Sequence, residues 1–238
     1  MSDNAAKSIN VPCPVLQEMY ATGHAVDLAG NKHPIESAIQ PDFSEALYRL
    51  IKARRPKRVL EIGMAYGASS LAILTALSEF GEGGELISID PAQSNGWHSI
   101  GVHNVARAGF ADAHRLIEKP DYLGLPELLQ EKVRIDLGYI DGWHTFDHAL
   151  LDFFYIDKLL PVGGVVGFND CGWKSVFKAI RFVETHRDYR EIDVGIAPQY
   201  PGGPVASLAK RFIGRNGSDR YFEKRKEWQS AHNFYAPF

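Results

Sequence analysis

The chain has 238 residues, of which 45% are hydrophobic, and a formal net charge of -3 at pH 7. This length and composition allow one sizeable hydrophobic core. The charge argues against a general nucleic-acid surface, because phosphate binding needs a basic surface that the chain as a whole lacks. The two cysteines, Cys13 and Cys171, are too few for a disulfide framework or a thiolate zinc site, so we expect a reducing, cytoplasmic setting.

The sequence carries no sign of membrane association. Its N-terminal stretch MSDNAAKSIN has no apolar core, and no uncharged apolar run approaches the roughly 20 residues that a membrane span needs. We therefore expect neither an export signal nor a membrane span.

Short apolar runs alternate with helical patterns from Pro56 onward, which is typical of βαβ units and a parallel sheet. Helices are predicted over residues 43–55, 68–80 and 144–160. Five strands are predicted, with the sequences KRVLEI (57–62), ELISID (85–90), AHRLIE (113–118), RIDLGYI (134–140) and GGVVGF (163–168).

Two last strands, predicted as an antiparallel pair, are YREIDVGI (189–196) and WQSAHNFYAPF (228–238). A Gly/Pro-rich and then basic stretch separates them. We expect an α/β fold: a Rossmann-like, doubly wound, seven-stranded sheet, mostly parallel with an antiparallel last strand, and helices on both faces.

Conspicuous residues follow the first two predicted strands. The first strand leads into a loop with Gly63 and Gly67, and the second ends at Asp90. A glycine loop lets the backbone approach a ligand, and the helix start beyond it offers free N–H groups. An acid at the next strand end can accept both hydroxyls of a ribose, so the pattern indicates a nucleoside site. The dinucleotide fingerprint is incomplete, which disfavours NAD. A purely structural role as a turn and a strand end stays open.

The stretch VLEIGMAYGASS (59–70), with ISIDPAQ (87–93) downstream, resembles the class I S-adenosylmethionine-dependent methyltransferases. It is most similar to the catechol O-methyltransferase-like group and to small-molecule O-methyltransferases related to macrocin methyltransferase. The resemblance covers roughly Pro41 to Glu184. It implies a cofactor site in which the loop holds the methionine part, Asp90 binds the ribose and Glu118 lies beside adenine. The residues implied are Glu61, Gly63, Gly67, Ser69, Asp90, Glu118 and Asp141.

A second group of polar residues follows the fourth and fifth predicted strands. If these strands are neighbours, Asp141 faces Asn169 and Asp170 at about 5 Å, which suits Mg²⁺. The resembling enzymes bind a divalent ion here with an Asp after the fourth strand and an Asp-Asn pair after the fifth. This chain has the reverse order, Asn169-Asp170, which leaves open which of the two faces the ion.

His144 stands three residues after Asp141, where the resembling metal-dependent enzymes place a general base. An imidazole is partly neutral at physiological pH and can accept a hydroxyl proton as the methyl group arrives. The alternative is that His144 caps or packs at a helix start. The helical spacing of His144, His148 and Asp152 also suits zinc, but the H-E-x-x-H glutamate is absent.

The resemblance implies a Mg²⁺-assisted O-methyltransferase that uses S-adenosylmethionine and acts on a small hydroxylated acceptor, such as a phenol, a sugar or a natural product. Residues 41–238 would form the methyltransferase domain, with a substrate-side insertion at about 196–226, and residues 1–40 an extension that forms part of a substrate lid. We also expect a homodimer or higher homo-oligomer. The alternatives are a same-fold metal-binding protein without methyl transfer, such as a cephalosporin hydroxylase-like protein, and a non-catalytic nucleoside-binding protein.

Overall fold

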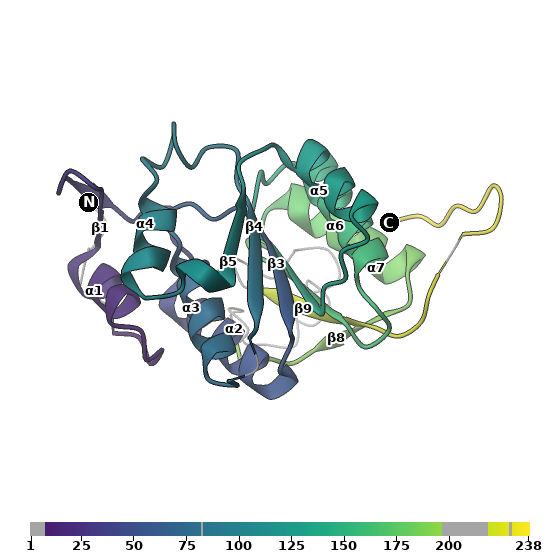
Figure 1. The fold of residues 1–238 in the computed structure, drawn as a ribbon. Helices are drawn as coiled ribbons and strands as arrows, with labels where there is room; N and C mark the ends of the chain where they lie inside the picture. The colour runs from purple at the N-terminus through teal and green to yellow at the C-terminus, as the bar shows by residue number, and fades with distance from the viewer. Residues whose placement is uncertain (1–7, 82, 197–218, 229) are drawn as a thin grey trace, which may run out of the picture. The chain divides into compact units, whose positions relative to one another are not determined.

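The computed structural model describes residues 8–81, 83–196, 219–228 and 230–238 (Figure 1). The chain divides into two compact units, Met1–Pro120 and Asp121–Phe238. The seven main strands belong to one sheet of order β5-β4-β3-β6-β7-β9-β8, and β1 and β2 form a separate antiparallel pair. Among the described residues, no helix has the length and apolar character that crossing a bilayer requires.

The first unit builds three parallel strands and the helices that pack with them. Helix α3 has no charged residue and is buried at every position but its last, as expected of a helix that is apolar on all sides. Helices α1, α2 and α4 contact it. The elements of this unit are α1 (Pro14–Thr22), β1 (His24–Val26), β2 (Lys32–Pro34), α2 (Pro41–Arg54), β3 (Arg58–Ile62), α3 (Ala68–Ser78), β4 (Glu85–Ile89), α4 (Ile100–Arg107), a short 3-10 helix (Ala111–Ala113) and β5 (His114–Ile117).

The second unit builds the other four strands of the sheet. Strands β6 and β7 are parallel, and β9 runs antiparallel to both β7 and β8. Helix α6 packs against α5 and α7, so the three helices lie side by side (Figure 1). The elements are α5 (Asp121–Gln130), β6 (Leu137–Ile140), α6 (Phe146–Leu159), β7 (Val165–Phe168), α7 (Lys174–His186), β8 (Tyr189–Ile192) and β9 (Arg220–Lys224).

The predicted fold class is confirmed: the sheet has seven strands and is mostly parallel, with one antiparallel strand. The first five predicted strands, which correspond to β3–β7, and the three predicted helices lie where the sequence predicts them, within a few residues at each end. Strand β8 covers the first half of the segment 189–196. Most of the predicted insertion at 196–226 falls outside the described residues.

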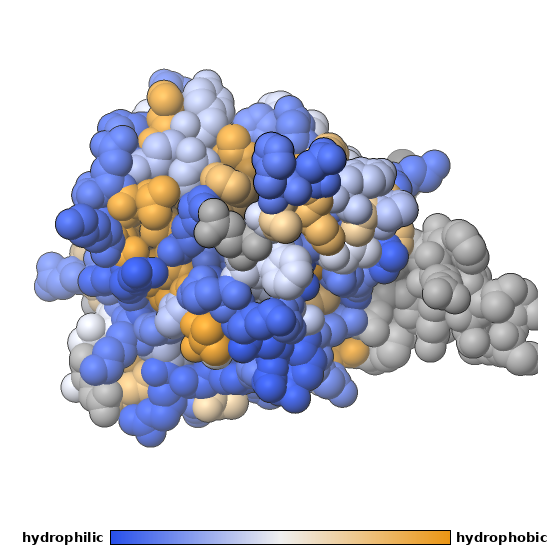
Figure 2. Space-filling view, turned by 90° about the vertical axis from the view of Figure 1, so that its right-hand side faces the viewer, coloured by the Kyte–Doolittle hydropathy of each residue, from blue (hydrophilic) through white to orange (hydrophobic). Residues whose placement is uncertain are grey.

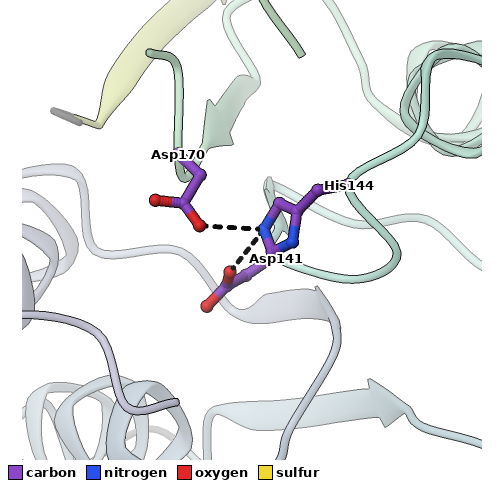
Figure 3. Close-up of side chains that lie close together, drawn as sticks. All are labelled: Asp141, His144 and Asp170. Carbon is purple, nitrogen blue, oxygen red and sulfur yellow. Dashed lines mark ion pairs between the residues drawn. The ribbon is translucent and has the colours of Figure 1, made fainter. Parts of the chain in front are cut away.

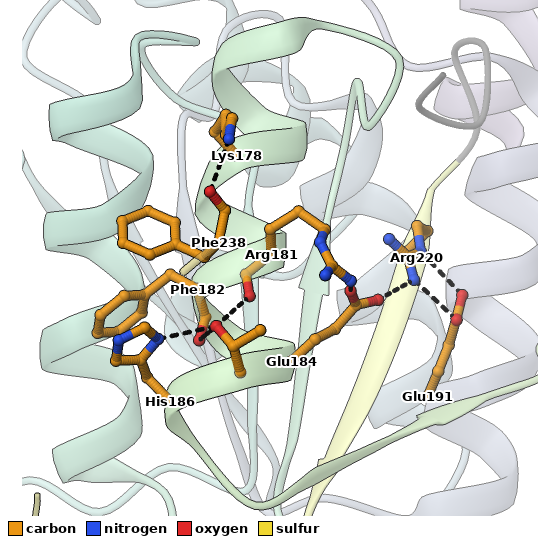
Figure 4. A network of polar contacts seen from close by, with 9 residues as sticks. Lys178, Arg181, Phe182, Glu184, His186, Glu191, Arg220 and Phe238 are labelled. Carbon is orange, nitrogen blue, oxygen red and sulfur yellow. Dashed lines mark hydrogen bonds and ion pairs between the residues drawn. The ribbon is translucent and has the colours of Figure 1, made fainter. Parts of the chain in front are cut away.

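The predicted last strand over 228–238 is wrong. The antiparallel strand is β9, inside the basic stretch, and the described residues of the C-terminal segment form no strand. Strand β9 is buried along its whole length, and its charged residues are paired there. Arg220 donates to Glu184 and Glu191 (Figure 4), and the Lys224 ammonium donates to the carbonyl oxygens of Asp157 and Leu160. Because of charged residues such as Arg220 and Lys224, a hydropathy pattern does not reveal strand β9.

The aromatic residues of the C-terminal segment pack on helices instead. The Phe238 ring contacts Phe182 and His186 on α7 and stacks on Phe146 at the start of α6, with ring centroids 5.3–6.2 Å apart. The Lys178 ammonium donates to the Phe238 carbonyl oxygen at 2.6 Å (Figure 4). The apolar residues over 228–238 that predicted a strand therefore include an aromatic side chain that packs on the surface of α7 and α6.

Figure 2 shows one face of the molecule, on which hydrophobic residues lie in small separate patches among hydrophilic ones. Scattered exposed apolar side chains of this kind are normal for a folded protein.

Gly167 on β7 lies opposite Tyr139 on β6 and Tyr221 on β9. A substitution at Gly167 therefore tests how these two rings pack against β7. A Cβ atom at Gly167 would lie 2.5 Å from Tyr221 Cε1 and 3.1 Å from Tyr139 Cδ2. Because both rings are fully buried, we expect Gly167→Ala to lower the free energy of unfolding by about 1–3 kcal/mol in urea denaturation. The loss should shrink in a Tyr221→Leu background, where the ring is absent. An equal loss in both backgrounds would contradict this packing.

Candidate nucleoside and cation sites

The glycine loop of the first unit connects β3 to α3. Gly63 and Gly67 both have left-handed backbone conformations, with φ of 86° and 83°. A Cβ atom at Gly67 would lie 3.1 Å from the carbonyl oxygen of Gly101, and one at Gly101 would lie 2.5 Å from that of Ala65. The loop and the start of α4 therefore touch backbone to backbone. Sequence reasoning missed Gly101, although a glycine inside a helix often has a packing reason.

Asp90, which follows β4, holds this loop in place. Its Oδ2 accepts hydrogen bonds from the backbone N–H groups of Met64 and Ala65 at 3.0 and 2.8 Å. Gln93, which sequence reasoning missed, donates from Nε2 to the same oxygen and to the Ala65 carbonyl oxygen. The carboxylate is 3% exposed. Its observed contacts order the loop, and its binding of a ribose stays a prediction.

Glu61, on β3, is fully buried beneath the loop. It accepts hydrogen bonds from the hydroxyls of Ser69 and Ser70 on α3, at 2.5 and 2.6 Å, and of Ser88 on β4, at 2.7 Å. A buried carboxylate persists only with such donors. The structure thus brings the predicted residues Glu61 and Ser69 into contact with each other, and their contact with a cofactor stays a prediction.

Glu118, which follows β5, is an exposed residue that accepts hydrogen bonds from the backbone N–H and the hydroxyl of Ser94. These hydrogen bonds lower the pKa of the Glu118 carboxyl. They tie the end of β5 to the loop after β4. A place beside adenine stays a prediction for Glu118.

The cation site predicted for the second unit centres on Asp141, His144 and Asp170 (Figure 3). Asp141 follows β6, His144 precedes α6 and Asp170 follows β7. His144 Nε2 lies 3.3 Å from Asp141 Oδ1 and 3.2 Å from Asp170 Oδ2, and the three ligand atoms lie within 4.8 Å of one another. Asp170 has a left-handed backbone, with φ of 51°, which is uncommon outside glycine. The fold brings these three residues together from two loops, the one between β6 and α6 and the one between β7 and α7.

Burial and the short distances between Asp141, His144 and Asp170 shift the pKa values of Asp141 and His144. Burial raises the pKa of Asp141 to about 6, and Asp170 adds to this rise while His144 opposes it. Asp141 in turn raises the pKa of His144, against the effect of burial. The cluster therefore favours a positive charge at its centre, whether on the imidazole or on a bound ion.

Asn169, the third predicted cation ligand, points its amide nitrogen elsewhere. Asn169 Nδ2 donates to Asp219 Oδ1 at 2.8 Å and to the Tyr139 hydroxyl at 3.3 Å. Asn169 also lines a cavity of about 10 Å³ together with Trp143, His144 and Asp152, which has room for roughly one water molecule. Its role as a ligand stays a prediction.

Asp219 is a residue that sequence reasoning missed. It is 3% exposed and accepts from Asn169, from the Tyr139 hydroxyl at 2.8 Å and from the Tyr221 hydroxyl at 3.0 Å. Burial raises the pKa of Asp219 to about 8, and these hydrogen bonds act in the opposite direction. No local pattern marks it, because it precedes a strand that the sequence does not reveal.

The helix-face zinc alternative is not assembled within the part of the chain that the structure describes. His144 lies with Asp141 and Asp170, whereas His148 Nδ1 lies 2.6 Å from Asp121 Oδ2. Asp152 is 1% exposed, and burial together with Asp121 raises its pKa well above the ordinary value. Its two carboxyl oxygens have no hydrogen-bond partner among the described residues.

Comparison with known proteins identifies a methyltransferase domain in this chain. Residues 60–171 match the family model described as a methyltransferase domain. The chain is 29% identical to tapetum-specific methyltransferase 1 of Arabidopsis thaliana over 182 residues, 75% of each chain. It is 26% identical to caffeoyl-CoA O-methyltransferase 2 of Petunia hybrida over 205 residues, 76% of this chain and 79% of the relative.

These matches show a methyltransferase domain at residues 60–171, and they are consistent with a class I S-adenosylmethionine-dependent methyltransferase. Solved structures agree with this assignment at the level of the fold. The O-methyltransferase from Bacillus cereus, solved in complex with SAH, has a TM-score of 0.60 at 18% identity and covers 79% of the chain and 84% of its own. TomG from Streptomyces achromogenes, solved in complex with SAM, has a TM-score of 0.59 at 20% identity and covers 80% and 83%. The curated relatives support O-methyl transfer for this methyltransferase.

The methyltransferase contains a titratable side chain linked to the buried Glu61. His114 Nε2 lies 3.0 Å from the Ser88 hydroxyl, and burial lowers the pKa of His114 to about 4. An unfolded histidine, with a pKa of about 6.5, binds a proton that the folded one does not between these pH values. The stability that this histidine contributes is therefore complete above about pH 6.5 and falls as the pH drops toward about 4.

We expect His114→Gln, which cannot titrate, to lose about 2 kcal/mol less free energy of unfolding than the wild type between about pH 7.5 and pH 5. Urea denaturation at the two pH values measures the difference. If both proteins lose the same amount, His114 does not titrate with a lowered pKa in the folded chain.

Proposed function

We propose that this methyltransferase transfers the methyl group of S-adenosylmethionine to a hydroxyl oxygen of a small acceptor, assisted by a divalent cation at Asp141 and Asp170. The single observation that carries the proposal is the convergence of these two carboxylates on His144 (Figure 3). Two close carboxylates repel each other unless a positive charge lies between them. The O-methyltransferase names of the curated relatives point to an oxygen acceptor.

The residues present fit a hard cation. Asp141 and Asp170 offer carboxylate oxygens on neighbouring strand ends, and Asn169 adds an amide beside them. Mg²⁺ is the ion that such oxygen ligands suit, with the remaining positions left to waters or to the acceptor. A cation bound here would lower the pKa of an acceptor hydroxyl that it contacts.

His144 acts in this proposal as the group that takes the acceptor proton. Neutral imidazole accepts the proton at Nε2, the atom that faces both carboxylates. The carboxylates then stabilise the imidazolium, which is the physical meaning of the raised pKa of His144. The hydroxyl oxygen is thereby left with the electron pair that attacks the methyl group, and the sulfonium sulfur leaves with the electrons of the broken bond.

Two exposed tryptophans beside His144 support a flat acceptor. Trp143 is 72% exposed and Trp173 is 57% exposed, and the Trp173 ring lies 5.4 Å from the His144 ring. Exposed indole faces suit a phenol or another planar acceptor. Sugars and other natural products remain in the proposed class.

The remaining assignments are proposals drawn from the sequence. They comprise the cofactor contacts of the glycine loop, the lid formed by residues 1–40, the substrate-side insertion, the homo-oligomer and the cytoplasmic setting. The loop residues Gly63 and Gly67 provide the backbone conformation that close approach to a cofactor needs.

The role of His144 is tested by His144→Ala. We expect unchanged affinity for S-adenosylmethionine in calorimetric titration and a 10²- to 10⁴-fold loss of turnover, about the contribution of a general base. Turnover is followed as SAH release with a phenol or sugar selected in an acceptor screen. His148→Ala serves as the control, because His148 contacts Asp121 and not the cluster. Wild-type turnover in His144→Ala would sink the general-base assignment.

The role of the cation is tested by chelation and by Asp141→Asn. We expect EDTA to abolish wild-type turnover and Mg²⁺ to restore it, because the two carboxylates need a counter-charge to hold the acceptor. Asp141→Asn should bind Mn²⁺ at least tenfold more weakly by titration calorimetry, since it removes one of two anionic ligands. An enzyme whose turnover is indifferent to EDTA refutes the cation.

A further inference from the structure

Asp219 lies directly behind the cation site proposed above. It precedes β9, which pairs antiparallel with β7 so that Arg220 lies opposite Phe168. The start of β9 and the end of β7 therefore meet at the same edge of the sheet, where Asn169 and Asp170 follow β7. The chain positions are 50 residues apart, and the backbone register alone brings Asp219 to Asn169.

Three buried donors converge on the Asp219 carboxylate. Asn169 Nδ2 reaches Oδ1, and the hydroxyls of Tyr139 and Tyr221 both reach Oδ2. The two tyrosine rings stack with centroids 6.3 Å apart and an interplanar angle of 16°. Gly167 has no side chain, which leaves the space that these rings occupy. Strand β6, strand β9 and the residue that follows β7 thus each contribute one donor to a single carboxylate.

This arrangement determines which end of the Asn169 amide is free. An amide has one donating end and one accepting end. Asp219 Oδ1 accepts only from the nitrogen, and the Tyr139 hydroxyl, which donates to Asp219, also accepts from that nitrogen. A flipped amide would lose the hydrogen bonds that the Asn169 nitrogen donates to Asp219 Oδ1 and to the Tyr139 hydroxyl. The amide oxygen is the end that a cation would bind.

We propose that Asp219 is a positioning residue of the cation site, which fixes Asn169 so that its amide oxygen is available to the ion. Asp219 itself is not a ligand, because both of its oxygens accept hydrogen bonds and it lies outside the group of Asp141, His144 and Asp170. The carboxylate acts through Asn169, as groups behind a metal ligand generally do. The inference rests on the proposed function in that it requires a cation at this site.

The test measures Mn²⁺ affinity of the full chain by titration calorimetry and by electron paramagnetic resonance of free Mn²⁺. We expect Asp219→Ala to bind Mn²⁺ about 10- to 100-fold more weakly than the wild type. Asp219→Asn should restore affinity to within a few-fold, because its amide oxygen still accepts from Asn169 Nδ2. Tyr221→Phe removes a donor to Asp219 that does not touch Asn169 and should weaken Mn²⁺ binding much less than Asp219→Ala does.

A double-mutant cycle separates positioning from general damage. In an Asn169→Ala background, Asp219→Ala should add little further loss, because the residue through which it acts is gone. The affinity for S-adenosylmethionine should stay at the wild-type value in every variant. If Asp219→Ala does not fold, Asp219→Ser takes its place in the same cycle.

Two results overturn the inference, and they are distinguishable. Wild-type Mn²⁺ affinity in Asp219→Ala, or losses that add fully in the cycle, removes the positioning role and leaves the cation site standing. A wild-type protein that binds no Mn²⁺ removes the cation site itself and, with it, the proposed metal assistance.

Discussion

Buried carboxylates on or beside the strands of the sheet are the constraint around which this protein is built. Moving such a group out of water costs several kcal/mol unless donors surround it. Glu61 obtains them from three serine hydroxyls, and Asp90 obtains them from backbone N–H groups. Asp219 obtains them from two tyrosines and an asparagine. In each case donors come from elements other than the one that carries the carboxylate, so satisfying the charge also fixes how those elements pack.

The cluster of Asp141, His144 and Asp170 differs from these three groups. Its carboxylates face an imidazole at 3.2–3.3 Å, and the cluster remains partly open to solvent. A carboxylate whose oxygens already accept hydrogen bonds from the protein needs no bound cation to stabilise it. A cluster that is completed only by a titratable ring can exchange that ring's proton for another positive charge. This contrast explains the two roles. Glu61, Asp90 and Asp219 stabilise the fold, whereas the cluster of Asp141, His144 and Asp170 is the proposed site of cation binding and proton transfer.

Much of the fold follows from local sequence patterns. The central strands are short apolar runs between turn residues, and helix α3 is apolar throughout, so both are visible without tertiary information. Strand β9 is not visible, because Arg220 and Lys224 look like surface residues until their buried partners are known. The C-terminal segment gives the opposite error, since its aromatic residues pack on α7 and α6.

Some residues of the candidate sites can likewise be recognised from the sequence, and others cannot. Gly63, Gly67 and Asp90 are recognisable because the spacing of a loop and a strand end is local. Ser88, Gln93 and Asp219 act through contacts that only the folded chain creates, and single residues of these types carry no pattern.

The backbone contact between Gly67 and Gly101 has a consequence for how this protein can vary. Each position excludes a side chain because of the other's backbone, so neither is free to change alone. A larger residue at either site requires the loop and α4 to separate, and the loop is already held by Asp90. Variation that alters the glycine loop must therefore be accompanied by a displacement of α4, which makes the two segments a single unit of evolutionary change.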